Sequence, residues 1–225
     1  NQWENILTYQ NIYNERHDVT LIAGTTALQN RYDNSGGANT NLPSNDPDDA
    51  YISNTIDPIA SQSAYQSASE SSLFSWFGKA NYVYDNTYLF SATFRADGSS
   101  RFGANNRFGY FPSFSAGYIM SHADFWNVDL INFFKVRASW GQNGNDNIPN
   151  SNWRASYEFG DYGLYTFGSD KNGGTTGAYP NRLANPDLTW ETSEQTNIGI
   201  DARFLDNRLS FTMDWYSKQT KDLLV

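Results

Sequence analysis

The residues of this chain that could act as catalysts are few. His17 and His122 are its two histidines, and it contains no cysteine. Neither histidine belongs to a recognisable motif with a Ser or Cys nucleophile, and neither has a second histidine at the spacing of a metal-ligand pair. We therefore interpret both as turn or interface residues. The sequence predicts no catalytic residue, and the protein is not expected to be an enzyme.

Two segments could hold an ion or a phosphate group. The acidic run "NDPDDAY" places Asp46, Asp48 and Asp49 close together, and calcium prefers oxygen ligands. Because the run lacks the full ligand pattern of a calcium loop, a solvated loop is the better interpretation. The glycine-rich stretch "GSDKNGGTTG" lacks the GKS or GKT ending and the following helix of a phosphate loop. The sequence thus predicts no metal site and no cofactor.

A binding site is better supported than a catalytic one. Residues 143–187 contain many aromatic side chains among Asn, Asp and Gly. Flat aromatic faces beside directional hydrogen-bonding groups suit the recognition of sugars or peptides. The candidate substrate-binding residues are Trp153, Tyr157, Tyr162, Tyr165 and Tyr179.

Composition narrows the class of protein. The net charge of -9 argues against a nucleic-acid-binding protein and favours neutral or cationic ligands over phosphates. Aromatic residues make up 16% of the chain and charged residues only 17%, which is unusual for a soluble enzyme. No apolar run reaches the ~18 residues that a membrane helix needs. A membrane β-barrel stays possible because its lipid-facing and lumen-facing residues alternate.

The elements that would position these residues are strands with one apolar and one polar face. In "NTYLFSATFRAD" the even positions include Tyr88, Phe90 and Phe94, whereas Ser91 and Arg95 stand at odd positions. Such alternation is typical of a strand with one apolar face. Its recurrence predicts strands at residues 2–13, 18–30, 72–84, 88–98, 106–119, 132–142, 188–205 and 209–219.

The connections between these strands alternate in length. Tight ones are expected at 14–17, 85–87 and 206–208 and a medium one at 120–131, whereas 31–71, 99–105 and 143–187 lie between them. Outer-membrane barrels carry short periplasmic turns and longer extracellular loops. We therefore predict an all-β fold, an antiparallel up-and-down transmembrane β-barrel with long extracellular loops at about 31–71 and 143–187. A soluble sandwich is the competing interpretation, less favoured because of the charged polar face and the long loops.

Three blocks resemble a known family. They are "FRADGSSRFGANNRFGYFPSFSAGYIMS", "FFKVRASWGQNGND" and "NPDLTWETSEQTNIGIDARFLDNRLSFTMDWYSKQTKDLL". In order and spacing they resemble the barrel of SusC/RagA-like TonB-dependent transporters of the outer membrane of Bacteroidota. The family-motif positions are Arg95, Asp97, Gly98, Arg101, Gly103, Pro112, Asn185, Pro186, Asp187, Trp190 and Glu191.

These motif residues are interpreted as structural. In "ADGSSRFG" the glycines permit tight turns, and Asp97 could pair with Arg95 or Arg101 on the lumen side. In "NPDLTWE" we expect Pro186 to fix the entry into a strand and Trp190 to lie at a membrane boundary.

The resemblance implies a barrel of about 22 strands with a plugged lumen. The predicted strands would then be a segment of about eight from this larger barrel, and residues 1–225 a partial TonB-dependent receptor β-barrel domain without the plug domain and the remaining strands. The ending "KDLLV" lacks the terminal aromatic residue of such barrels. The chain is therefore expected to come from the middle to later part of a longer protein.

The implied function is active import of a nutrient, a glycan or a peptide, across the outer membrane. The chain would be part of the SusC-like component of a SusCD-type complex energised by TonB. Expected partners are a SusD-like surface lipoprotein, TonB (through segments outside this chain), outer-membrane lipid and a second SusCD pair, with no nucleic acid. The aromatic residues of 143–187 could equally pack against the lipoprotein. The alternative is a self-contained small barrel with a structural or adhesive role, whose first and last strands would pair.

Overall fold

The computed structural model of the chain describes residues 1–54, 56, 61–166 and 174–224, with the backbone alone for 160–166 and 174–176. Contacts divide the chain into two units, one of Asn1–Leu28 with Ser72–Val225 and one of Gln29–Ser71. The helices described are the short 3-10 helices η1 (Pro47–Asp49), η2 (Ala104–Asn106) and η3 (Met120–His122). Within the described ranges, no helix is long and apolar enough to span a membrane.

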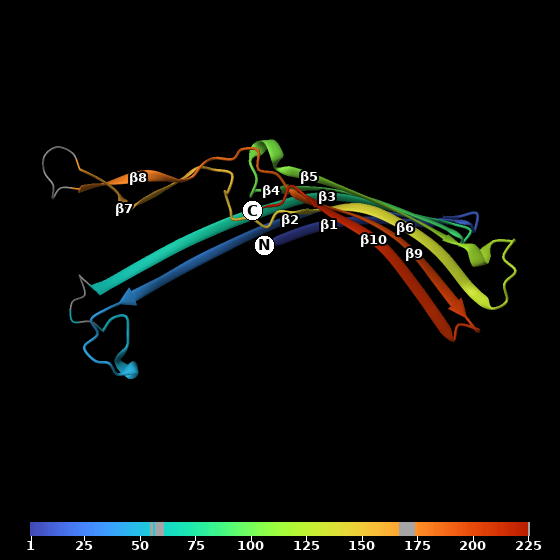
Figure 1. Ribbon diagram of the computed structural model, residues 1–225, viewed down its shortest axis with the longest axis horizontal. Helices are drawn as coiled ribbons and strands as arrows, with labels where there is room; N and C mark the ends of the chain where they lie inside the picture. Colours follow the sequence, from blue (N-terminus) through green and yellow to red (C-terminus); the bar gives the residue numbers. More distant parts are fainter. Residues whose placement is uncertain (55, 57–60, 167–173, 225) are drawn as a thin grey trace. The chain divides into compact units, whose positions relative to one another are not determined.

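The main element is an eight-stranded sheet in which the strands follow one another in the order β1-β2-β3-β4-β5-β6-β9-β10. The strands are β1 (Gln2–Tyr13), β2 (His17–Asn39), β3 (Gln62–Tyr84), β4 (Tyr88–Ser99), β5 (Phe108–Ile119), β6 (Ile131–Asn145), β9 (Glu191–Phe204) and β10 (Leu209–Lys221). Figure 1 shows β3 to β6, β9 and β10 side by side. A separate two-stranded sheet joins β7 (Ser156–Thr166) to β8 (Gly174–Arg182).

The predicted all-β, up-and-down sheet is confirmed, with two differences. First, β2 continues to Asn39 and β3 begins at Gln62, so both ends of the connection expected at 31–71 are strand. Residues 29–39 and 62–71 are rich in Ser, Asn, Gln and Gly. The alternation of hydrophobic and polar residues is therefore lost there, although both strands continue. Second, β7 and β8 lie inside the segment that was expected to be an irregular loop.

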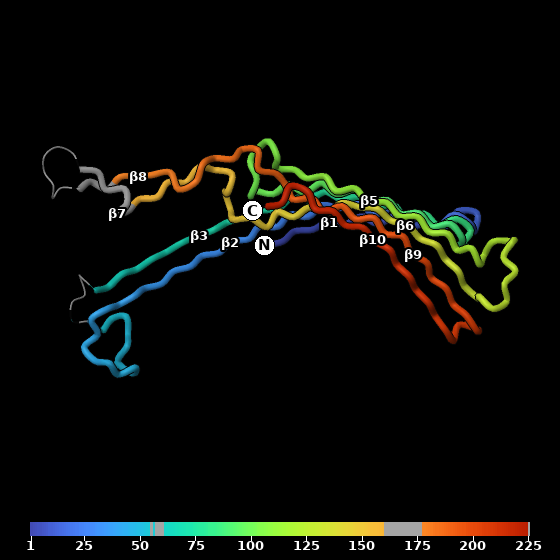
Figure 2. Tube along the Cα trace, in the orientation of Figure 1, coloured from blue at the N-terminus to red at the C-terminus, as the bar shows by residue number. Residues whose placement is uncertain are grey.

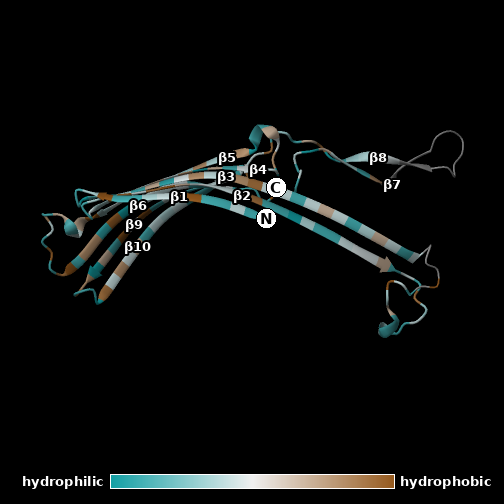
Figure 3. Ribbon diagram, turned by 180° about the vertical axis from the view of Figure 1, so that it is seen from behind, coloured by the Kyte–Doolittle hydropathy of each residue, from teal (hydrophilic) through white to brown (hydrophobic). Residues whose placement is uncertain are grey.

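The sheet has an apolar face and a polar face. The register places the apolar residues of one strand beside those of the next, so each face is continuous across the strands. On the apolar face, rings stack between neighbouring strands, at centroid distances of 6.4 Å for Tyr82 and Phe90 and 6.2 Å for Phe114 and Trp140. Phe114 remains 56% exposed, so no second layer of the described residues covers this face. Figure 3 shows hydrophobic and hydrophilic residues alternating along the strands. The sandwich interpretation, in which apolar rows face each other across two layers, is therefore wrong.

The tight turns lie together at one end of the sheet (Figure 2). The turn between β1 and β2 places Asn14 at φ 50° and Glu15 at φ 59°, and the turn between β3 and β4 places Asp85 at φ 51° and Asn86 at φ 50°. Two successive left-handed residues give a hairpin turn whose twist matches that of the strands. Asn and Asp tolerate this conformation better than most residues, which explains their presence there.

The sheet is not closed. Strands β1 and β10 stand at its opposite edges and do not pair with each other. In a self-contained eight-stranded barrel these two strands would be hydrogen-bonded. The alternative of a complete small barrel is therefore wrong, and both edges of the described sheet are left for pairing with other strands.

Adjacent residues of β4 test the assignment of the two faces. Ala92 lies on the apolar face and Thr93 on the polar face, and both stand in the middle of the strand. Because a charged residue facing lipid at mid-depth costs about 2–4 kcal/mol, Ala92→Arg in the whole protein should lower the free energy of unfolding from lipid vesicles by that amount. Thr93→Arg should cost less than about 1 kcal/mol. Equal losses for both variants would contradict the assignment.

Candidate functional site

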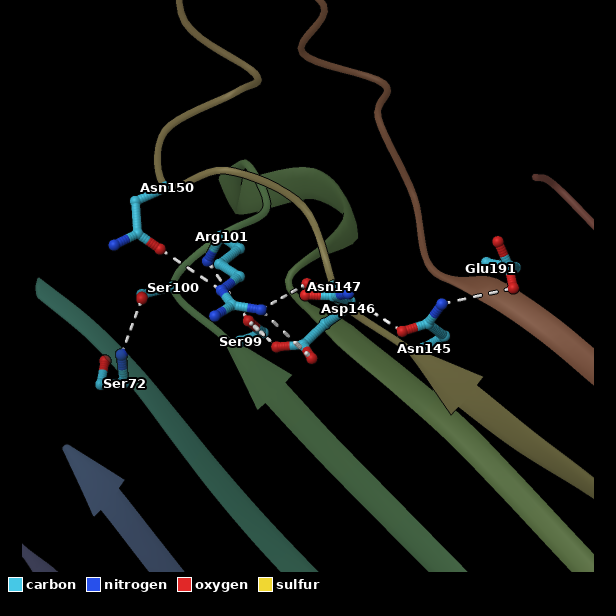
Figure 4. Close-up of polar contacts among 9 residues, drawn as sticks. All are labelled: Ser72, Ser99, Ser100, Arg101, Asn145, Asp146, Asn147, Asn150 and Glu191. Atoms are coloured by element: carbon cyan, nitrogen blue, oxygen red, sulfur yellow. Dashed lines mark hydrogen bonds and ion pairs between the residues drawn. The ribbon is translucent and has the colours of Figure 1, made fainter. Parts of the chain in front are cut away.

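A polar cluster at the loop end of the sheet joins β4 to the segment that follows β6 (Figure 4). The Ser99 hydroxyl donates to Asp146 Oδ2 at 2.8 Å, and Arg101 Nη1 donates to the Asp146 carbonyl at 2.9 Å. Arg101 Nε also donates to Asn150 Oδ1 at 3.3 Å. We call these four residues the loop-side anchor, because they fix the start of the long segment 146–190 to the rim of the sheet.

An aromatic core accompanies the loop-side anchor. Phe102 is 0% exposed, and Phe111 and Trp190 are each 6% exposed. The Trp190 ring lies 5.0 Å from that of Phe102 and 5.4 Å from that of Phe111, and its Nε1 donates to the Arg107 carbonyl at 3.2 Å. That Trp190 lies at a membrane boundary stays a prediction. The ring is buried among residues that come from distant parts of the sequence.

Glycines create the room for this core. A Cβ at Gly144 would overlap the Phe111 ring, and one at Gly109 would lie 3.0 Å from Trp190 Cδ2. A Cβ at Gly103 would lie 3.2 Å from the Pro186 carbonyl oxygen and 3.6 Å from the Trp153 ring. The glycines are needed for close approach between segments.

The two sequence motifs meet in space. Asn106 Nδ2 donates to the Asp187 carbonyl at 2.9 Å, and the Asn185 amide donates to the Trp153 carbonyl at 3.0 Å. At the start of β9, Glu191 accepts from Asn145 Nδ2 at 3.3 Å. The motif residues thus form a structural frame that holds both ends of segment 146–190.

Three further motif residues, Arg95, Asp97 and Pro112, lie within the sheet itself. Of the two arginines that could pair with Asp97, Arg95 does so, with Nε 2.7 Å from Oδ1, and its Nη2 donates to Ser75 Oγ at 3.1 Å. Pro112 lies opposite Phe94 in β4, and the pairing of β5 with β6 begins at the next residue, Ser113. Pro112 has no N–H to donate. It lies just before the first pair of the β5–β6 ladder and therefore does not interrupt that ladder.

The β7–β8 hairpin separates its side chains into two faces. Tyr157 pairs with Pro180 and Phe159 with Ala178, whereas Glu158 pairs with Tyr179 and so shares the opposite face. Tyr157 is 63% and Phe159 is 72% exposed. Burial raises the pKa of the Tyr179 phenol, and the charge of Glu158 and a hydrogen bond with it raise that pKa further. One face is thus apolar and open, and the other is polar.

The three predicted substrate-binding residues whose side chains are described do not share one surface. Trp153 lies at the root of the hairpin, with the Arg154 guanidinium 4.7 Å from its ring centroid, and Tyr157 and Tyr179 lie on opposite faces. The side chains of Tyr162 and Tyr165 are outside the described residues. Phe159 was absent from the predicted set, although the alternation of residues 156–159 could have placed it beside Tyr157.

The polar face carries a second ion cluster near the turn end. Arg137 donates from Nε to Asp201 Oδ2 at 3.1 Å and from Nη2 to Asp214 Oδ2 at 2.9 Å, and Thr212 donates to Asp201 Oδ1. The Arg137 guanidinium has room because residue 199 is a glycine. A Cβ at that position would lie 2.7 Å from Arg137 Cζ. Among the described side chains, no group of three or more His, Asp or Glu could hold a metal ion.

An antiparallel sheet of long strands with one uncovered apolar face, one charged polar face and alternating turn lengths is the architecture of a membrane β-barrel. Residues 1–225 match the family described as "TonB dependent receptor-like, beta-barrel". The chain therefore belongs to this family of outer-membrane barrels, and its sheet is a segment of a transmembrane barrel.

Individual relatives agree with this assignment. The chain is 33% identical over 226 residues to TonB-dependent receptor P39 of Formosa agariphila, covering 99% of this chain and 20% of the relative. It is 35% identical over 177 residues to TonB-dependent receptor SusC of Bacteroides thetaiotaomicron, covering 74% of this chain and 16% of SusC. The structure of the RagAB peptide transporter matches with a TM-score of 0.85 and 26% identity, over 100% of this chain and 24% of that one. The chain thus spans about a quarter or less of the length of these relatives.

A glycine substitution tests the buried core beside the anchor. Because a methyl group at Gly144 would overlap Phe111, Gly144→Ala should lower the free energy of unfolding of the whole protein by about 1–3 kcal/mol. The cost should shrink when Phe111→Leu is already present, as a double-mutant cycle would measure. Gly78→Ala is the matched control, since the nearest atom to its Cβ is 4.0 Å away. A loss as large for Gly78→Ala as for Gly144→Ala would contradict this account.

Proposed function

We propose that the whole protein is an outer-membrane importer energised by TonB, and that residues 1–225 form part of its barrel wall. The observation that carries the proposal is that the family match and the likeness to the RagAB peptide transporter each extend over the full chain. An importer needs a polar interior inside an apolar exterior, which the two faces of the sheet provide. The apolar face would contact outer-membrane lipid. The protein is accordingly proposed to be a transporter and not an enzyme.

The substrate is proposed to be a nutrient, either a glycan or a peptide. The likeness to SusC supports a SusC-like role beside a SusD-type surface lipoprotein, in complexes that pair into dimers. The likeness to a peptide transporter keeps peptides among the candidates. TonB would act through segments outside this chain.

The β7–β8 hairpin is the part of this chain proposed to meet a partner or a substrate. It lies in the segment that the loop-side anchor ties to the rim opposite the tight turns. Its apolar face, with Tyr157 and Phe159, is open. Exposed aromatic side chains of this kind are common anchors in protein interfaces and also stack on sugars.

Import can be tested in the source bacterium. Deleting the gene should abolish growth on one class of nutrient among neutral polysaccharides, acidic polysaccharides and peptides, and the wild-type gene should restore it. Restoration should fail when TonB is deleted or the proton gradient is collapsed. Uptake that continues without TonB would contradict the proposed energisation, and unchanged growth on every class would contradict import.

The hairpin can be tested with the double variant Tyr157→Ala, Phe159→Ala. Both side chains are exposed, so the stability of the protein should not change, whereas a contact with a partner or a substrate should weaken at least tenfold (roughly 1.4 kcal/mol). Loss of co-purification with the lipoprotein would assign the face to that partner, and loss of substrate affinity alone would assign it to the substrate. Leu183→Ala, at a residue 80% exposed outside the hairpin strands, is the control. No change in either readout would contradict a binding role.

A further inference from the structure

A band of small uncharged side chains crosses the polar face of the sheet. The register aligns Asn81 with Ser91, Ser91 with Ser115, Ser115 with Ser139, and Ser139 with Asn197, so five strands contribute to one row. The adjoining row runs from Thr93 through Ser113 and Gly141 to Gln195. We call the two rows the polar belt, which consists of Asn81, Thr93, Ser91, Ser113, Ser115, Ser139, Gln195 and Asn197.

The surface of the polar belt contains two depressions. One depression of about 340 Å³ and a second of about 540 Å³ share the side chains Ser91, Ser115, Ser139 and Asn197 in their linings. The hollows form because serine and Gly117 or Gly141 stand where larger side chains could have filled the space. Val83 and Leu89 border the larger hollow and add a small apolar surface.

Two arginines beside the polar belt are paired with carboxylates. On the loop side, Arg95 is paired with Asp97 at 2.7 Å, and on the turn side, Arg137 is held between Asp201 and Asp214. Lys79 continues the second row on β3, where it pairs with Thr93, and Lys135 and Arg137 take part in lining the larger hollow. The eight belt residues themselves carry no formal charge.

Much of the hydrogen-bonding capacity of the belt is free. Asn197 donates to Ser139 Oγ at 3.3 Å and accepts from Gln195 Nε2 at 2.8 Å. The side chains of Asn81, Thr93, Ser91, Ser113 and Ser115 form no hydrogen bond with the other described residues, and none of their polar atoms is both buried and unpaired. They can therefore donate to and accept from a solute or water.

We propose that the polar belt is a contact surface for a neutral, hydroxyl-rich solute, which assigns an oligosaccharide and not a peptide as the transported class. The proposal rests on the importer function above. Strands ~4.8 Å apart, with same-face residues about 7 Å apart along each strand, present a fixed grid of donors and acceptors. A saccharide exposes hydroxyl groups along both edges of each ring and can satisfy such a grid. A peptide would need apolar pockets for its side chains and an acidic group for its amino end, and none of the eight belt residues supplies either.

The contacts are individually weak, since a neutral hydrogen bond contributes only about 0.5–1.5 kcal/mol. Weak contacts suit a path along which a solute has to move on. Removing two register-paired hydroxyls, Ser91 and Ser115, should weaken binding about tenfold.

The test is equilibrium binding to the purified full-length protein in detergent, followed by saturation-transfer NMR. The probes are neutral hexa- to octasaccharides of glucose and of xylose, and a glycine- and alanine-rich octapeptide in free and in end-capped form. At least one saccharide should bind, and the double variant Ser91→Ala, Ser115→Ala should weaken it about tenfold. The matched control, Ser210→Ala with Ser217→Ala, also removes two strand hydroxyls but lies outside both hollows, and it should bind the saccharide as the wild type does.

Three outcomes would overturn the proposal. The first is that no saccharide binds, or that one binds equally to wild type and to the double variant. The second is that the octapeptide binds and loses affinity in the double variant. The third is that the double variant changes only the protease sensitivity of the full chain, which would mean that the belt holds another part of the same protein. Because binding is measured without TonB, a failure of TonB-dependent import would not produce any of these results.

Discussion

The structure depends on one constraint, the register that keeps the aromatic rows of neighbouring strands on one face of the sheet. Because side chains alternate with a period of two, a shift of one residue between neighbouring strands would turn a whole apolar set to the polar side. The pairing of Phe90 with Ala116 and of Arg95 with Phe111 shows the register holding from the loop end to the turn end of β4. In lipid, backbone groups have no water to bond, so this continuous ladder also satisfies the main chain.

The loop end of the sheet is built on a different principle. There the chain leaves the ladder, and its stability comes from a compact core of Phe102, Phe111 and Trp190 with the loop-side anchor beside it. Large aromatic rings fit because glycines stand opposite them, as Gly144 does for Phe111. A barrel wall that needs no core thus acquires a small one where it has to hold a long surface segment in place. This arrangement separates the wall of the barrel from the long segment 146–190.

Much of the sheet could be predicted from the sequence, because the signal is local. Strand β1 matches its predicted bounds of 2–13, and the tight turns lie where Asn and Asp interrupt the alternation. The extension of β2 to Asn39 was missed because its residues are polar on both faces and leave no hydrophobic period to count. Strands β7 and β8 were missed for a related reason, since aromatic residues scattered among glycines are equally typical of a binding loop.

The sequence by itself determined the class of fold, the two faces of each strand and the resemblance to transporter barrels, since each of these is written in neighbouring residues. Only the tertiary structure decided which residues meet. It paired Asp97 with Arg95, buried Trp190 beneath the rim, placed Tyr157 and Tyr179 on opposite faces, and brought five strands together into the polar belt. These contacts join residues far apart along the chain, and their partners depend on strand register and loop path, which no local pattern specifies.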